Sequence, residues 1–266
     1  MNRSMQVLVI TGGSSGIGLA TARLFAQKGW RVFELSRHER VQVEGVTHLD
    51  CDVTDEAQCL DAIDEVLWQE GQIDVLISNA GYGISGSVEF TDTGDAKAMF
   101  DVNFFGALNI TKAVLPLMRD QRSGRILFTS SVAAPLSVPF QSMYSASKAA
   151  LNDMALALQN EVRPFGIRVG VLMPGDVRTG FTAARQKNVS AEENQVYERA
   201  EKAVEAMEKD ERNGMSPEQM ARLFYRMATR RFLPVYNVGG GLYRLFCLLD
   251  KILPKSLVNA IEGKMY

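Results

Sequence analysis

A tyrosine and a lysine four residues apart, in Tyr144-Ser-Ala-Ser-Lys148, form the pattern with the clearest chemical meaning in this sequence. In a helix, residues i and i+4 share a face, so the phenol and the ammonium would lie about one turn apart. A nearby cation favours the phenolate, so Lys148 is expected to move the pKa of Tyr144 from ~10 toward neutrality. The pair is suited to general acid and base chemistry. An accidental surface pair has the same spacing, so the pattern needs support from its neighbours.

A glycine-rich segment near the N-terminus, VLVITGGSSGIGLATARLFA at residues 7–26, has the pattern of a buried strand, a tight turn and a helix. Three kinds of site share this local structure. A phosphate-binding P-loop is excluded because no Lys and Ser or Thr follow the last glycine. A hydrolase elbow with Ser14 as nucleophile needs a late histidine, and the histidines are His38 and His48. The segment is therefore interpreted as a dinucleotide-binding turn with backbone amides at a helix N-terminus.

The elements that must hold these residues alternate along the chain between short β-rich runs and helical periods. This alternation implies βαβ units and a parallel sheet with helices on both faces. We predict an α/β fold, a doubly wound, Rossmann-like parallel sheet in a single domain at 1–266. Its core is predicted at 5–180 and a substrate lid with a helical C-terminal extension at 181–266. The predicted strands are 7–10, 31–36, 46–50, 73–78, 124–130 and 167–173, and the predicted helices include 55–71, 95–119 and 142–162.

Small or polar residues follow each of these strands. Ligands of doubly wound sheets bind beyond the carboxyl ends of the strands, so these residues are candidates for a site. Turns favour the same residue types, which explains any one strand end but is less convincing for all of them together. The residues include Asn79-Ala80-Gly81 after the fourth strand, Ser130-Ser131 after the fifth and Pro174-Gly175 after the sixth.

Taken together, these segments resemble the short-chain dehydrogenase/reductase family. Thr11 to Gly18 is similar to its T-G-x-x-x-G-x-G cofactor turn, and Ser78-Asn-Ala-Gly81 to its N-N-A-G motif, with serine in place of the first asparagine. The segment PGDVRT, residues 174–179, is similar to its P-G-x-V-x-T segment. The resemblance covers roughly residues 5–180, and the tail is more similar to steroid- and retinol-type members than to fatty-acid-synthesis reductases.

The resemblance implies a catalytic set of Asn103, Ser131, Tyr144 and Lys148. In this set the tyrosine would exchange a proton with the substrate oxygen, and the serine would orient that oxygen by a hydrogen bond. Lys148 would also bind the nicotinamide ribose, and Asn103 would hold a water that relays protons. Ser131 is preferred over Ser130 because its spacing to Tyr144 matches the family. For Asn103 alone, a packing role within its helix is the alternative.

The implied cofactor is NADP(H), with NAD(H) as the alternative. An acidic residue at the end of the second strand would bind the ribose of NAD, whereas a 2′-phosphate needs a cation. Arg37 stands there, although it also fits an ordinary solvated arginine. Asp52 and Val53 resemble the family's adenine contacts. The implied cofactor-binding residues are Gly12, Ser14, Ser15, Gly16, Ile17, Gly18, Arg37, Asp52, Val53, Asn79, Ala80, Gly81, Tyr144, Lys148, Pro174, Gly175, Val177 and Thr179.

Composition narrows the remaining function classes. The net charge is -2 with no basic block, so nucleic acid is not an expected partner. The three cysteines form no C-x-x-C pair, so neither a disulfide framework nor a metal site is expected. No apolar run approaches the ~20 residues that cross a bilayer, and Met1 to Met5 has no signal-peptide pattern. The expected location is the cytoplasm.

The substrate is expected to contact 82–90, 132–143 and the residues after Gly175. Much of this sequence is apolar, which suits a lipophilic ketone or alcohol of the steroid, retinoid or long-chain class, although core packing would have the same composition. The predicted function is therefore an NADP(H)-dependent oxidoreductase acting on CH-OH groups, a carbonyl reductase. The alternative is a catalytically silent NADP(H)-binding sensor or scaffold, which would not need the Tyr144-Lys148 pair.

Two further segments have open roles. Residues 185–212 are rich in Glu, Lys and Arg and are predicted to form a solvated helix that covers the site. Residues 231–266 are leucine-rich with a net charge of +3, typical of a packed helix, a substrate cover, a subunit contact or a membrane-surface helix. They are interpreted as departing from the family's usual ending of a strand and a glycine loop. Family members commonly pair through helices corresponding to Asp95–Arg119 and Ser142–Val162, which implies a homodimer or homotetramer.

Overall fold

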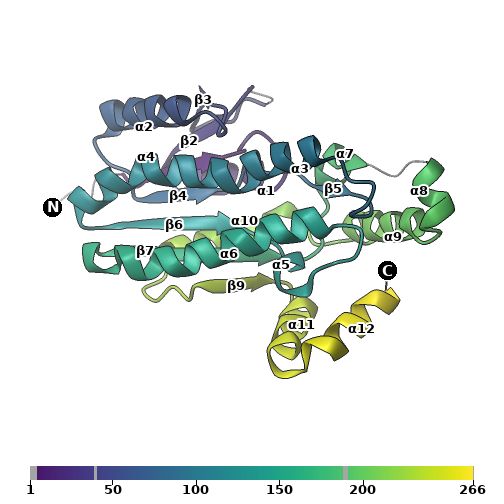
Figure 1. The fold of residues 1–266 in the computed structure, drawn as a ribbon. Coiled ribbons are helices and arrows are strands. Elements are labelled where there is room, and N and C mark those ends of the chain that lie inside the picture. Colours follow the sequence, from purple (N-terminus) through teal and green to yellow (C-terminus); the bar gives the residue numbers. More distant parts are fainter. Residues whose placement is uncertain (1–4, 39–40, 188–190, 266) are drawn as a thin grey trace.

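The structure is a computed structural model that describes residues 5–38, 41–187 and 191–265. Its centre is a parallel sheet of seven strands in the order β3-β2-β1-β4-β6-β7-β9 (Figure 1). The order reverses direction after β1, as in doubly wound folds. The predicted fold class is confirmed. The strands are β1 (Val7–Thr11), β2 (Arg31–Ser36), β3 (Val46–Asp50), β4 (Val75–Ser78), β6 (Gly124–Thr129), β7 (Ile167–Pro174) and β9 (Tyr236–Gly239).

Helices cover both faces of the sheet. One face packs against α1 (Gly16–Gln27) and α10 (Pro217–Thr229), and the other against α2 (Glu56–Glu70), α4 (Gly106–Gln121) and α6 (Ser142–Val162). Because both faces are covered, the central strands are apolar throughout, and every residue of β1 and β4 is buried. This rigid layer fixes the positions of the strand ends, where the predicted site residues lie.

The long helix predicted at 95–119 is divided in the structure. Its parts are α3 (Thr93–Phe100), a π-helical turn η1 (Asp101–Phe105) and α4. In η1 the amide of Gly106 donates to the carbonyl of Asp101, five residues back, and this shifts the register of the helix. π-Helical turns of this kind are frequent at functional sites, and this one carries Asn103.

The expectation that the C-terminal segment departs from a strand and a glycine loop is wrong. Residues 236–239 form β9, which pairs in parallel with β7 from Val171↔Tyr236 to Pro174↔Gly239. The glycines at 239–241 then lead into a helix. The strand was missed because it is short and bordered by Pro234 and three glycines, so its apolar alternation is weak.

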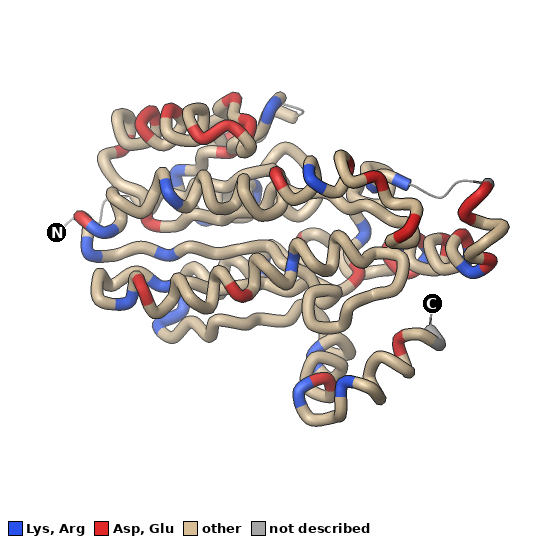
Figure 2. Tube along the Cα trace, viewed as in Figure 1, with Lys and Arg blue, Asp and Glu red and all other residues tan. Residues whose placement is uncertain are grey.

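The remaining elements surround the carboxyl ends of the strands. They include α5 (Ala133–Leu136), η2 (Arg163–Phe165), α7 (Phe181–Ala184), α8 (Ala191–Val196), α9 (Ala200–Arg212) and the small sheet of β5 (Ile84–Ser85) and β8 (Gln186–Lys187). The predicted lid corresponds to β8, α8 and α9, and its residues 188–190 lie outside the described part of the chain. Figure 2 shows many of the Asp and Glu positions on α2, α8 and α9, while α9 buries Ala203, Val204 and Met207.

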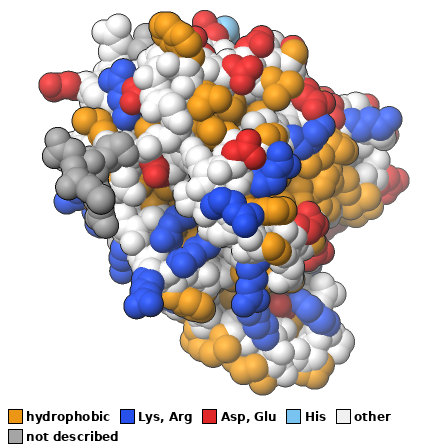
Figure 3. Space-filling view, turned by 90° about the vertical axis from the view of Figure 1, so that its left-hand side faces the viewer, with side chains coloured by type: hydrophobic (Ala, Val, Ile, Leu, Met, Phe, Trp, Pro, Cys, Tyr) orange, Lys and Arg blue, Asp and Glu red, His pale blue; other side chains and the backbone are white. Residues whose placement is uncertain are grey.

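Two helices, α11 (Gly241–Ile252) and α12 (Lys255–Met265), form a lobe below the sheet (Figure 1). In Figure 3 the outer edge of this lobe carries apolar side chains, with Lys and Arg side chains above them. Among the described residues, no helix combines the length and apolarity required to span a membrane.

Candidate active site

The predicted site residues meet in one cleft at the carboxyl ends of the strands. The cavity has a volume of about 1350 Å³, larger than the roughly 300–1,000 Å³ of common small-molecule pockets. It therefore has room for a dinucleotide and a substrate together. Of the residues predicted from the sequence, all except Gly18 and Asn103 line it. Those two lie directly behind the lining, against Gly12 and Gly81 respectively.

Tyr144 lies in the first turn of α6, and its ring faces the cleft beside Phe181. Its hydroxyl is hydrogen-bonded to the side chain of Ser131, just beyond β6. The Ser131 hydroxyl also accepts from the amide of Ala133 at 3.1 Å, which fixes its direction. Ser130 is directed elsewhere, because its hydroxyl donates to the carbonyl of Lys148 at 3.2 Å. The geometry thus places Ser131, and not Ser130, next to the phenol.

The pKa of Tyr144 differs from the sequence-based expectation. Burial raises it to about 12, and the hydrogen bond from Ser131 offsets this only in part. The expected lowering by Lys148 is not found. The ammonium donates to the carbonyl of Thr129 at 2.9 Å and lies 5.8 Å from the centre of the phenol ring. The phenol is therefore protonated at neutral pH and suited to donating a proton.

Lys148 is buried below the tyrosine on the same face of α6. Burial lowers its pKa to about 8, because no carboxylate compensates the loss of hydration. Its charge is therefore present at neutral pH but is lost by mild alkali. Gly81 lies close to it, since a Cβ built on Gly81 would be 3.3 Å from the Lys148 Nζ. A larger residue at 81 would separate the lysine from the cleft.

Asn103 holds the loop after β4 in place. Its Oδ1 accepts from the amide of Tyr82 at 3.0 Å, and its Nδ2 donates to the Tyr82 carbonyl at 2.9 Å and to the Ser147 hydroxyl at 3.2 Å. The side-chain amide is thus occupied by backbone and α6 contacts. This arrangement ties the π-helical turn, the Gly81 loop and α6 together, and a water relay through Asn103 stays a prediction.

The glycine turn fits a bound anion. Gly12 and Gly16 have φ of 64° and 51°, a region that side chains rarely adopt, and a Cβ on Gly18 would be 2.2 Å from the Gly12 carbonyl oxygen. These glycines bring the N-terminus of α1 to the edge of the cleft. Its free amides and dipole favour a negatively charged group such as a pyrophosphate. The residues present therefore fit a dinucleotide.

Asn79 fastens this turn to the neighbouring strands. Its backbone amide donates to the Thr11 hydroxyl at 2.9 Å, and its side chain donates to the Thr11 and Gly12 carbonyls, each at 3.2 Å. The amide of Ala80 also donates to the Thr11 hydroxyl, at 3.1 Å, and Thr129 donates to the Asn79 Oδ1 at 3.0 Å. Three strand ends are thus joined into one rigid edge. Ser78 is buried and structural, so its departure from the family motif leaves these contacts intact.

One end of the cleft, where the sequence analysis predicts the adenosine contacts, is lined by Arg37, Asp52 and Val53. Arg37 is exposed just after β2. Asp52 accepts from the amide and the hydroxyl of Thr54 at 3.0 and 2.8 Å, which turns the loop after β3. Val53 is buried against Gly106 at the start of α4. A cation and a small apolar surface are therefore available to the adenosine half of a dinucleotide.

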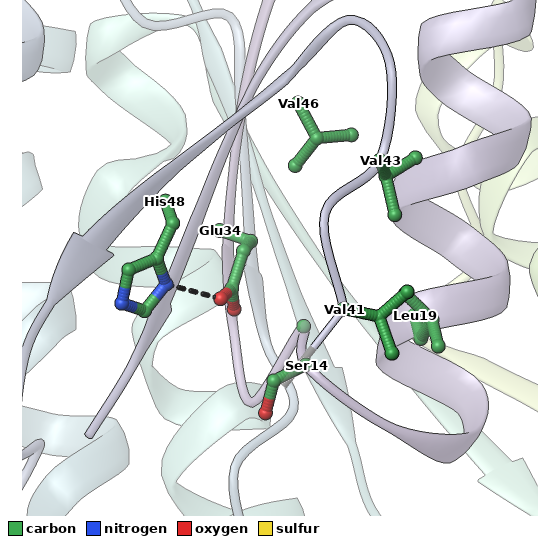
Figure 4. A pocket seen from close by; sticks show the side chains of 8 residues that line it. Ser14, Leu19, Glu34, Val41, Val43, Val46 and His48 are labelled. Carbon is green, nitrogen blue, oxygen red and sulfur yellow. Dashed lines mark hydrogen bonds and ion pairs between the residues drawn. The ribbon is translucent and has the colours of Figure 1, made fainter. Parts of the chain in front are cut away.

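Beneath the glycine turn lies a cluster that the sequence analysis missed. The carboxylate of Glu34 is buried and is bound by His48 and by the Ser36 hydroxyl, and His48 also contacts Asp50 at 3.0 Å. Figure 4 shows the imidazole turned toward Glu34, with Ser14 nearby. Burial alone would lower the pKa of His48, but hydrogen bonds to Asp50 and Glu34 and their charges outweigh it, so the pKa is raised. Glu34 and His48 are register partners in β2 and β3, a signal that strand pairing could have provided.

The segment at the end of β7, residues 174–179, borders the part of the cleft where the nicotinamide is predicted to bind. Pro174 accepts from the amide of Val132 at 3.0 Å, and Thr179 lies against Gly16. A Cβ on Gly175 would be 2.2 Å from the ring of Tyr243, whose hydroxyl donates to Asp176. Val177 is buried and bridges to Met215. The C-terminal lobe is therefore docked directly on the predicted cofactor segment.

The end of the cleft beyond Tyr144 is mainly apolar, and its lining falls within the ranges predicted for the substrate, although no single residue of the C-terminal lobe was named. Part of it comes from α5 and the loop before α6, as predicted, and part from the C-terminal lobe. The lobe residues that line the cleft are Leu242, Tyr243, Phe246, Leu249, Asp250, Leu253, Val258, Ile261 and Glu262. Helical periodicity marks α11 as amphipathic, but only the tertiary structure shows which neighbour its faces meet.

The chain is similar to known proteins over most of its length. The family model for short chain dehydrogenases matches residues 6–190. A 3-ketodihydrosphingosine reductase of Bacteroides thetaiotaomicron is 35% identical over 256 residues, which cover 96% of this chain and 95% of that protein. A short-chain dehydrogenase from Streptomyces avermitilis has a similar structure, with a TM-score of 0.83, 29% identity and 94% of each chain covered. A family member from Burkholderia phymatum in complex with NAD has a TM-score of 0.77 at 25% identity, with 95% of this chain and 96% of that chain covered.

Proposed function

The chain belongs to the short-chain dehydrogenase/reductase family of oxidoreductases, whose fold binds a nicotinamide cofactor, and from this premise we propose that it is an NADP(H)-dependent reductase of a long-chain lipophilic ketone. The observation that carries the proposal is a buried phenol, hydrogen-bonded to Ser131, in a cleft that is lined by both polar and apolar residues. The name of the Bacteroides relative, which matches nearly the full length of this chain, favours a long-chain amino-alcohol ketone over a steroid or a retinoid.

The roles of the side chains follow from their positions. Ser131 and Tyr144 present two hydrogen-bonding hydroxyls to one point in the cleft, where a substrate oxygen would be held. Tyr144 gives its proton to that oxygen during reduction and recovers it during oxidation. Lys148 places a positive charge behind the phenol and faces Gly81, the position suited to ribose hydroxyls. When bound, a nicotinamide cofactor supplies or accepts the hydride.

The preference for NADP(H) is supported by the two charges at the end of β2. Arg37 lines the cleft and is free to meet a 2′-phosphate, for which a guanidinium is a suitable partner. Glu34, the acidic residue of the same strand, does not line the cleft, because its carboxylate is held beneath the glycine turn by His48 and Ser36. No carboxylate of β2 is therefore directed at the ribose.

The cofactor proposal is tested by titrating the protein with NADPH and NADH. The wild type is expected to bind NADPH at least about tenfold more tightly, and Arg37→Asp to reverse that order. Equal affinities of the wild type for both cofactors would overturn the assignment. Arg23→Asp serves as a control, because it makes the same change of charge at an exposed arginine of α1 that does not line the cleft.

The reaction is tested with purified protein, NADPH and a panel of ketones of increasing chain length. Turnover is expected to rise with chain length, and Tyr144→Phe to lower kcat by about 10²–10⁴-fold while NADPH affinity is unchanged. If the protein binds NADPH but turns over none of the panel, and Tyr144→Phe changes nothing, the protein is the sensor or scaffold considered as the alternative.

A further inference from the structure

The C-terminal lobe exposes a continuous apolar surface. Ile252 is 69% exposed, and six other large apolar side chains of α11 and α12 are more than a third exposed. On α11 they recur at helical spacing, so they share one face and are not scattered. We call this set the outer face of the lobe: Leu242, Leu245, Leu248, Leu249, Ile252, Leu257 and Ile261.

The exposed charged side chains within 241–263 have one sign. Arg244, Lys251 and Lys255 are exposed beside it, and Figure 3 shows basic side chains just above the apolar edge of the lobe. Within 241–263, where exposure is described, no Asp or Glu is exposed. Asp250 is buried and bound to Lys255 at 2.5 Å, and Glu262 lines the cleft. An apolar face with basic flanks complements an anionic lipid surface.

The outer face is continuous with the apolar end of the cleft. Leu242 and Leu249 belong to both, since each is exposed and each lines the cavity. Ile261 does the same from α12. The cleft therefore reaches this face, and Leu242, Leu249 and Ile261 provide apolar contacts for a chain that enters it there.

A second copy of the chain is a less suitable occupant. A symmetric contact between two outer faces would bring Arg244 and Lys251 near their own counterparts. No exposed carboxylate within 241–263 is available to neutralise them. Lipid headgroups with negative charge supply the missing partner.

We propose that the outer face binds the surface of an anionic lipid bilayer and that the substrate enters the cleft from the bilayer. The first part stands on the surface itself, whereas the second part rests on the proposed function. Leu245, Leu248 and Ile252 do not line the cleft, so they contact lipid without forming the substrate site.

Vesicle flotation tests the first part. The probes are phosphatidylcholine vesicles with and without phosphatidylglycerol. The full-length protein is expected to float with the anionic vesicles, and Leu248→Glu or Ile252→Glu to reduce the bound fraction at least about tenfold. Lys251→Gln is expected to give a smaller loss that added salt mimics. Leu60→Glu changes an equally exposed leucine of α2 and is expected to bind as the wild type does.

Three results would overturn the surface proposal. The first is a wild type that floats with neither kind of vesicle. The second is an equal loss for Leu60→Glu, which would make the effect non-specific. The third combines two measurements: the wild type binds no vesicles, and light scattering gives Leu248→Glu half the molar mass of the wild type. That result would make the outer face a contact between two copies of the chain.

Activity measurements separate this proposal from the proposed function. Leu248→Glu is expected to reduce a short, water-soluble ketone at the wild-type rate, but a long-chain ketone dissolved in anionic vesicles at least about tenfold more slowly. Loss of both rates together would contradict entry from the bilayer. Vesicle binding that Leu248→Glu removes, in a protein that reduces no ketone, would support the surface and overturn the function.

Discussion

The sheet and the C-terminal lobe bury their apolar residues in opposite ways. β1, β4 and the centre of β6 are completely buried between two layers of helices. In α11, by contrast, Cys247 and Asp250 are the buried residues, while five leucine and isoleucine side chains are exposed. Packing within the chain thus explains why the strands of the sheet are apolar. It does not explain why the lobe carries apolar side chains on its surface. The difference is consistent with the two proposals above, in which the ends of the strands hold the cofactor and the lobe contacts lipid.

The largest effect that this comparison predicts concerns stability. Phe128 in β6 is fully buried, so Phe128→Ala should lower the free energy of unfolding by about 3–5 kcal/mol. Leu248 on α11 is 53% exposed, so Leu248→Ala should change it by less than about 0.5 kcal/mol. Urea unfolding of both variants measures the difference. A comparable loss for Leu248→Ala would mean that the lobe packs as the sheet does.

The next largest predicted effect concerns cofactor affinity and compares Gly18 in the glycine turn with Gly263 in the lobe. A Cβ on Gly18 would be 2.2 Å from the Gly12 carbonyl oxygen, whereas one on Gly263 in α12 would meet nothing within 4 Å. Gly18→Ala should therefore weaken NADPH binding by roughly 100-fold, about 2.7 kcal/mol, and Gly263→Ala should leave it unchanged. Fluorescence titration with NADPH, with far-ultraviolet circular dichroism to check folding, measures this. Wild-type affinity of Gly18→Ala would show that the turn does not hold the cofactor.

The pH dependence of reduction tests whether the charge of Lys148 in the cleft contributes to the reaction, whereas the charge of a lysine in the lobe does not. The pKa of Lys148 is lowered to about 8, so its charge is present below that pH and lost above it. For reduction, kcat/KM should be level up to about pH 8 and then fall toward tenfold per pH unit. Lys255→Gln in α12 should leave the profile unchanged, and Lys148→Arg should move the fall to higher pH. A level profile through pH 10 in the wild type would contradict a role for this charge.

The smallest effect concerns His48. Its pKa is raised in the folded protein, so its contribution to stability is complete below the unfolded value of ~6.5 and is lost as the pH rises through the folded value. His48→Gln should therefore cost about 1 kcal/mol at pH 6, with the difference disappearing toward pH 9. Urea unfolding of both proteins at pH 6 and at pH 9 tests whether the difference in stability decreases as the pH rises. A difference that grows with pH would show that the imidazole is neutral beside Glu34.

Local sequence patterns were sufficient to predict those elements whose bounds are marked by their own residues. The bounds of β2, β3 and α6 agree with the prediction, because each has a clear period and clear turn residues at its ends. The helix at 95–119 was not predicted to divide, because nothing in its periodicity marks a π-helical turn. β9 was missed because its strand character depends on pairing with β7.

The sequence by itself determined the fold class and marked the glycine turn and the Tyr144-Lys148 pair, since these patterns are local. Ser131 was predicted from the resemblance to the family and from its spacing to Tyr144. Only the tertiary structure decided the protonation of the phenol, because burial raises the pKa of Tyr144 more than its hydrogen bond from Ser131 lowers it. It also decided which surface α11 presents, because helical periodicity defines faces but not their neighbours. Distances between elements distant in the chain, such as Tyr243 to Gly175, exist only after folding.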